Sequence, residues 1–124
     1  MITPRQRYRD SAAERLRTIL RNEFSRRRQL NPRYSLRAFA RSVDLEHATL
    51  SQLIRGKRTM TWKAIRAIAA RMRWTGKALL ESVSHDRSAW DSRALAGRLG
   101  ISLDEVNVAL TDLCLFGLLE WKGE

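Results

Sequence analysis

The sequence predicts an all-α protein of two modules, residues 1–84 and residues 85–124. Apolar residues recur at i, i+3, i+4 and i+7 along nearly the whole chain, which is the spacing of one face of a helix. Helix-capping residues, prolines and glycines divide this pattern into short segments. The alternation typical of a β-strand is absent until the last few residues. We therefore expect five helices in the first module and a small helical segment in the second.

The charge is strongly positive and unevenly distributed. Lys and Arg number 24 against 13 Asp and Glu, a formal net charge of +11. Residues 1–75 contain 19 basic and 5 acidic side chains, whereas residues 76–124 contain 5 and 8. Such an excess indicates a polyanionic partner: DNA, RNA or an acidic membrane surface. Most of the cations are Arg, whose forked guanidinium suits phosphate and guanine.

The composition excludes several classes of protein. The single cysteine, Cys114, allows neither a disulfide framework nor a cysteine-based zinc site, and its apolar neighbours predict a buried thiol. The N-terminus lacks the apolar core of a signal peptide. The most apolar run, LCLFGLL, is far shorter than the ~20 residues of a membrane span. We expect a folded cytoplasmic protein that does not enter a membrane.

The first predicted helix begins at a capping box, Ser11 to Glu14. It ends before Asn31-Pro32, because the residue before a proline avoids the α-region. Its apolar face consists of Ala13, Leu16, Ile19, Leu20 and Phe24. Its basic tail contains residues 26–28, three arginines that we expect to be solvated.

Two short helices follow, separated by a tight break at residues 44–46. Ser35 caps the first of them, and Arg37 and Arg41 lie together on its polar face. Its apolar stripe is Leu36, Phe39, Ala40 and Val43. The second helix buries Leu50, Leu53 and Ile54. It stops at Gly56, since glycine readily adopts the conformation that follows a helix end.

A fourth helix is predicted from about Thr61 or Trp62 to Met72, and a fifth around Lys77 to Val83. The fourth buries Ile65, Ile68, Ala69 and Met72, and the fifth buries Leu79, Leu80 and Val83. The following SVSHDRSAWDS is typical of a polar linker.

The second module begins near Asp91 with a short helix that ends at Gly100. A second capping box, Ser102 to Glu105, starts the next helix. The inward residues of the two helices are Leu95, Ala96, Leu99, Val106, Ala109, Leu110 and Leu113. Gly117 ends the second helix, and LLEW begins a predicted strand. This order resembles the winged-helix arrangement, with a wing that is incomplete or pairs elsewhere.

Residues 34–58, YSLRAFARSVDLEHATLSQLIRGKR, resemble the helix-turn-helix of the Cro and phage-repressor class of bacterial and phage regulators. The matching residues are Ala40 at the helix crossing, Leu45 in the turn, Leu50 and Leu53 in the second helix, and the ending Arg55-Gly56-Lys57-Arg58. The resemblance covers about residues 11–83 and implies the five-helix, lambda-repressor-like fold. It departs from the family at Asp44, where the turn often has glycine; Asp tolerates a left-handed backbone better than most residues.

The resemblance implies that the second helix of the motif enters the major groove of DNA. The residues predicted to read bases are His47, Ala48, Thr49, Ser51, Gln52 and Arg55. Gln52 can pair with adenine N6 and N7, and the methyl groups of Ala48 and Thr49 can approach a thymine methyl. The residues predicted to contact phosphates are Ser35, Arg37, Arg41, Lys57 and Arg58. His47 is not expected to bind a metal, because no ligand partner stands at a suitable spacing.

The last helix has the opposite character. It carries Asp104, Glu105 and Asp112 and no Lys or Arg, so DNA phosphates would repel it. Its outward line is Asp104, Val108, Thr111 and Leu115, which leaves two apolar side chains to cover. We expect residues 90–124 to form a dimerisation or partner-docking surface, or to pack on a further segment.

The leading prediction is a sequence-specific transcriptional regulator that binds double-stranded DNA as a homodimer. The alternative is an antitoxin, or a phage- or plasmid-type interaction protein, whose acidic C-terminal half binds a protein while DNA binding serves autoregulation. RNA binding is less well supported, because aromatic stacking platforms and glycine-clamp loops are missing. We expect neither an enzyme nor a cofactor, since we find no paired carboxylates, catalytic triad or phosphate-cradling glycine loop.

Overall fold

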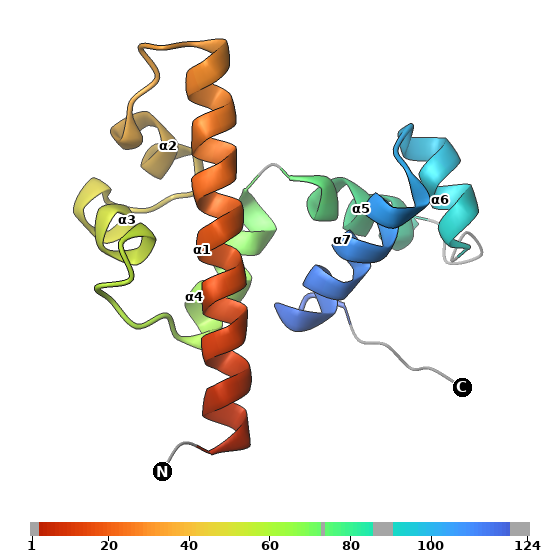
Figure 1. Cartoon of the computed structure of the whole chain (residues 1–124), viewed down its shortest axis with the longest axis horizontal. Helices are drawn as coiled ribbons and strands as arrows, with labels where there is room; N and C mark the ends of the chain where they lie inside the picture. Colours follow the sequence, from red (N-terminus) through yellow and green to blue (C-terminus); the bar gives the residue numbers. More distant parts are fainter. Residues whose placement is uncertain (1–2, 73, 86–90, 120–124) are drawn as a thin grey trace. The chain divides into compact units, whose positions relative to one another are not determined.

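The computed structural model describes residues 3–72, 74–85 and 91–119, and within these residues the protein has seven α-helices and no β-strand. The all-α prediction is confirmed. The chain divides into two compact units, Met1–Met72 and Arg73–Glu124. The first contains α1 (Pro4–Leu30), α2 (Leu36–Ser42), α3 (His47–Ile54) and α4 (Trp62–Arg71) (Figure 1). The second contains α5 (Thr75–His85), α6 (Ser92–Leu99) and α7 (Leu103–Leu115).

Helix α1 is longer than the sequence predicts. It begins after Thr3, whose hydroxyl accepts from the Gln6 N–H while the Gln6 side chain accepts from the Thr3 N–H. The start predicted at Ser11 is therefore wrong, because this earlier cap and Pro4 at the first helical position begin the helix two turns sooner. The predicted end before Asn31-Pro32 is confirmed.

The core of the first unit is built from the apolar stripes of all four helices. Its fully buried large side chains are Leu16, Leu20, Phe39, Leu50, Met60, Ile65, Ile68 and Met72. The predicted cap at Ser35 is confirmed, since its hydroxyl accepts from the Ala38 N–H; in the same way the Thr61 hydroxyl accepts from the Ala64 N–H and caps α4. Helix α1 packs against α3 and α4, and α2 packs against α3, so α1 supports α3 directly and α2 through α3.

The second unit is formed by α5, α6 and α7 around a separate core. This core consists of Leu79, Leu95, Val106, Ala109 and Leu113. The predicted boundary between residues 84 and 85 therefore differs from the observed one. Helix α5 packs its apolar face on α6 and α7 and belongs with them. The predicted linker SVSHDRSAWDS spans residues 82–92, but residues 82–85 belong to α5, and Asp91 and Ser92 start α6. Residues 86–90, and the Val83 side chain, lie outside the described part of the chain.

The C-terminal segment corrects two further predictions. Gly117, at φ 74°, reverses the chain after α7, and the Leu118 N–H donates to the Leu113 carbonyl at 2.9 Å. Leu118 and Leu119 then pack on the core of the second unit and are not in a strand; residues 120–121 of the predicted strand lie outside the described range. Asp112 is only 5% exposed, so of the three carboxylates predicted to be repelled by DNA phosphates only Asp104 and Glu105 are exposed. Cys114 is half-buried, and burial raises the pKa of its thiol.

Candidate nucleic-acid interface

The turn between α2 and α3 brings the two short helices into close contact. Asp44 has a φ of 57°, the left-handed conformation expected at this position, and its carboxylate lies 3.3 Å from the Arg71 guanidinium at the end of α4. The Leu45 N–H donates to the Ala40 carbonyl at 2.9 Å. Ala40 is buried where α2 meets α3, so its small side chain permits the close approach.

The outer face of α3 carries the predicted base-reading residues. His47, Ala48, Gln52 and Arg55 are exposed, and Thr49 and Ser51 at its edges are half-buried. Leu50 and Leu53, on the opposite face, are buried. Helix α3 and its C-cap residue Arg55 therefore carry all six predicted residues, four of them exposed.

The predicted phosphate-contacting residues flank this face on two other segments. Arg37 and Arg41 are exposed on α2, and Lys57 and Arg58 are exposed in the loop after α3. Ser35 is exposed as well, but its hydroxyl oxygen already accepts the Ala38 N–H as the helix cap, so only its O–H proton is free to donate.

The C-terminal end of α3 is held by the backbone and by arginines of α1. The Gly56 N–H donates to the Leu53 carbonyl at 3.2 Å and the Lys57 N–H donates to the Gln52 carbonyl at 2.9 Å, with Gly56 at φ 72°. The Arg17 Nε donates to the Leu53 carbonyl at 2.9 Å, and Arg21 donates to the Ile54 carbonyl. These arginines satisfy the open carbonyls that a helix end otherwise leaves to water.

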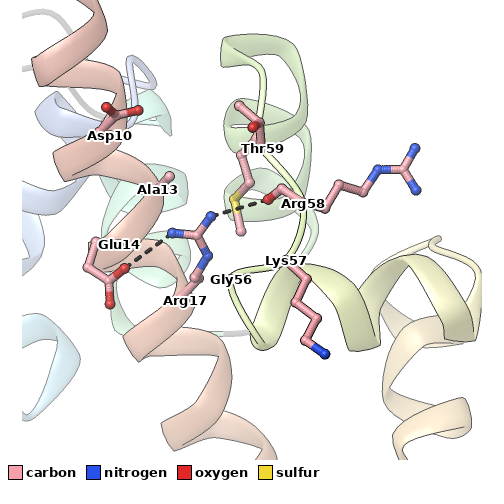
Figure 2. A pocket seen from close by; sticks show the side chains of 9 residues that line it. Asp10, Ala13, Glu14, Arg17, Gly56, Lys57, Arg58 and Thr59 are labelled. Atoms are coloured by element: carbon pink, nitrogen blue, oxygen red, sulfur yellow. Dashed lines mark hydrogen bonds and ion pairs between the residues drawn. The ribbon is translucent and has the colours of Figure 1, made fainter. Parts of the chain in front are cut away.

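Arg17 also reaches the loop beyond α3. Its Nη2 donates to the Arg58 carbonyl at 3.3 Å, and its Nη1 lies 3.2 Å from the Glu14 carboxylate (Figure 2). The guanidinium lines a depression of about 300 Å³ between α1 and residues 56–60. In Figure 2 the side chains of Lys57 and Arg58 point away from Arg17. Arg17 therefore holds the main chain of the loop while both loop cations are directed outward.

The Arg58 side chain lies against the outer face of α3. Its Nη1 donates to the Gln52 Oε1 at 3.4 Å. Gln52, predicted from the sequence to contact a base, and Arg58, predicted to contact a phosphate, are therefore in contact with each other.

Arg27 is not the solvated cation that the sequence predicts. Its guanidinium lies 5.0 Å from the centroid of the Phe39 ring and donates to the hydroxyls of Tyr34 and Ser42 at 2.9 and 3.1 Å. Its Nε donates to Glu23 at 2.9 Å. Burial would raise the pKa of Glu23, but hydrogen bonds and charge from Arg26 and Arg27 outweigh it, so this pKa lies below its ordinary value. Arg27 thus fastens α2 to α1.

Sequence reasoning missed the roles of Arg17, Arg21 and Arg27. The carbonyls bound by Arg17 and Arg21 lie 33 to 41 residues away along the chain, and Arg27 reaches Ser42 15 residues away, so helical spacing carries no sign of these contacts.

The two units differ in charge. Residues 1–72 contain 18 basic and 5 acidic side chains, whereas residues 73–124 contain 6 and 8. Within the described residues there is no group of three or more His, Cys, Asp or Glu that would hold a metal ion. Over the same residues, no helix has the length and apolar character needed to cross a membrane.

Comparison with known proteins found no matching family, no similar curated protein and no similar solved structure.

Proposed function

We propose that this protein is a sequence-specific DNA-binding transcriptional regulator, with α2 and α3 as a helix-turn-helix of the Cro and phage-repressor type. The observation that carries the proposal is the outer face of α3, which is polar, exposed and flanked by exposed cations on α2 and on the loop after α3. It belongs to the unit that holds the excess of positive charge. A short helix of about 10–12 Å diameter fits the major groove of B-form DNA, which is about 12 Å wide.

In the proposed complex, the N-terminal half of α3 lies in the major groove. His47, Ala48 and Thr49 enter first, and Gln52 and Arg55 follow about one and two turns after Ala48 on the same side. Amide and guanidinium groups donate to acceptors on base edges, while the small Ala48 and the Thr49 methyl leave room for a thymine methyl.

The flanking cations fix the position of the helix on the duplex. Arg37 and Arg41 contact the phosphates on one side of the groove, and Lys57 contacts those on the other. Such contacts supply affinity that falls with salt and carry no sequence information of their own. We propose that two copies bind a two-fold-related operator, since dimers of this class read half-sites about 34 Å apart.

A selection experiment tests this function. Double-stranded DNA bound by the full chain is enriched from a random pool, and affinity for the selected sequence is measured by fluorescence anisotropy. Gln52→Ala and Arg55→Ala should each reduce the preference for the selected sequence by about 10-fold or more, whereas Lys57→Ala should weaken binding to all sequences about equally.

Arg93→Ala is the matched control, because it removes one exposed cation from the second unit. It should leave the affinity unchanged. Failure to enrich any sequence, or unchanged specificity in both α3 variants, would refute the proposed function.

A protein-binding role for the second unit is the other candidate, and one observation favours it. Leu103 and Val108 on α7 are 39% and 52% exposed, beside the carboxylates of Asp104 and Glu105. Apolar side chains next to acidic ones suit a basic protein partner, as in an antitoxin. Co-purification of a basic protein by the wild-type chain, lost on Val108→Asp, would support this role; a chain that purifies alone and regulates its promoter alone would count against it.

A further inference from the structure

The contact between Gln52 and Arg58 links the outer face of α3 to the loop that follows it. We propose that these two side chains read DNA as one unit, and that Arg58 determines base specificity and does not merely hold a phosphate. This inference rests on the proposed DNA-binding function and goes beyond it by naming the base that the pair prefers, which is guanine.

Main-chain hydrogen bonds just before Arg58, and one to its own carbonyl, fix the backbone position of Arg58. The backbone bonds of Gly56 and Lys57 close the end of α3, and Arg17 holds the Leu53 and Arg58 carbonyls together. The Arg58 side chain then points away from Arg17, and its guanidinium reaches Gln52 on the exposed face. The backbone of Arg58 is therefore held in place, and its side chain places a positive charge beside the exposed face of α3.

The orientation of the Gln52 amide follows from the chemistry of its neighbour. A guanidinium has only donors, so the amide must turn its oxygen, and not its NH₂ group, toward Arg58. One lone pair of the oxygen is then occupied, and the adjacent positive charge makes it a poorer acceptor for a second donor. The Nε2 group, with its two N–H bonds, faces away from the guanidinium.

The pair therefore presents mostly donors to a base edge: the amide NH₂ and the remaining guanidinium N–H groups. In the major groove guanine offers two acceptors, N7 and O6, and no donor, whereas adenine offers one acceptor and one donor. Reading adenine through both N6 and N7 requires the Gln52 oxygen to accept a hydrogen bond. The sequence-based expectation of an adenine contact assumed a free amide, and the contact with Arg58 shifts the preference to guanine.

Lys57, in the same loop, is the control for the loss of one positive charge. It is exposed and points away from Arg17, and it carries the same charge as Arg58. A single ammonium cannot form the two parallel bonds by which a guanidinium recognises N7 and O6. Substitution of Lys57 therefore reports the effect of losing one cation from this loop without loss of the proposed reading pair.

The test begins with sequences selected by the full wild-type chain. Each position of the half-site is then replaced by the other three base pairs, and competition is measured by fluorescence anisotropy. We expect one guanine position at which wild type discriminates by about 5- to 150-fold, the range of one good bidentate contact. Arg58→Ala and Gln52→Ala should both lose discrimination at this same position, and the double variant should lose little more than either alone.

Arg58→Lys keeps the charge and should recover affinity but not discrimination, and Lys57→Ala should leave the base preference unchanged. Circular dichroism of each variant checks that it is folded. A uniform loss of affinity in Arg58→Ala, like that of Lys57→Ala, would show that Arg58 contacts phosphate only and would overturn the inference while leaving the proposed function intact. Selection of adenine at the position that Gln52→Ala relaxes would also overturn it. If no sequence is enriched at all, the proposed function fails and this inference fails with it.

Discussion

Arg17→Ala tests whether α1 positions the end of α3 and the loop after it. The side chain is only 13% exposed and donates to two main-chain carbonyls, of Leu53 at 2.9 Å and of Arg58 at 3.3 Å. A hydrogen bond from a charged donor contributes about 1.5–3 kcal/mol, and the longer bond belongs below this range. The ion pair with Glu14 adds less than about 1 kcal/mol, because that carboxylate is largely exposed. We expect the free energy of unfolding to fall by about 3 kcal/mol.

Two further variants separate the contributions to this loss. Glu14→Gln removes the ion pair and keeps both carbonyl bonds, so it should cost less than about 1 kcal/mol. Arg17→Lys keeps the positive charge, but a single ammonium group cannot reproduce the forked hydrogen bonds of a guanidinium to both carbonyls. It should therefore lose about half of the stabilisation. Unfolding in urea, followed by circular dichroism, gives the free energies, and hydrogen exchange at residues 53–58 reports the local effect. If Arg17→Ala lies within about 0.5 kcal/mol of wild type, the contribution of one weak hydrogen bond, and exchange is unchanged, the positioning role is refuted.

Substitutions at Glu23, Gly56 and Gly76 give distinct results. Glu23→Gln should cost stability at neutral pH, and because the folded pKa of Glu23 is lowered, the difference from wild type should shrink as pH falls below 4.5 in urea titrations. Gly56→Ala should cost about 1–2 kcal/mol and weaken the proposed DNA binding, because its φ of 72° strains any residue with a Cβ; Gly56→Asn should cost less in both assays. Gly76→Ala should destabilise the second unit by about 1–3 kcal/mol and alter tryptophan fluorescence, because its methyl group would overlap the Trp74 indole. Gly97→Ala, where the methyl group meets nothing, is the control and should be neutral or stabilising.

Helices with a strict apolar stripe and a capping residue could be predicted from the sequence. Ser35 and Thr61 each precede such a stripe, and both cap the helix that follows. The start of α1 was missed because the turn after Thr3 is polar, so hydrophobic spacing does not extend to it. The amphipathic pattern of α5 shows that one face is apolar but does not say which core receives it. Its place beside α6 and α7 depends on contacts between distant segments.

The candidate site, like the fold, could be predicted from the sequence only in part. Which side chains of α3 are exposed follows from the helical wheel, and the exposure of His47, Gln52 and Arg55 agrees with it. The link between Gln52 and Arg58 could not be derived from the wheel, because Arg58 lies beyond the helix end, where the backbone no longer has a fixed period. Its direction depends on the left-handed Gly56 and on the carbonyl bonds from Arg17.

The internal use of arginine limits how many cations remain for a polyanion. In the first unit, Arg17, Arg21 and Arg27 bind carbonyls, hydroxyls or aromatic rings of the protein itself, and Arg71 pairs with Asp44. The net charge alone therefore overstates the expected number of phosphate contacts. If the proposed DNA-bound dimer forms, three or four flanking cations per subunit would give about six to eight phosphate contacts, and hence a slope of log K against log salt of about −5 to −7. A much steeper slope would mean that some of these arginines leave their partners within the protein and contact phosphates when DNA binds. The bound structure would then differ from the free one at these side chains.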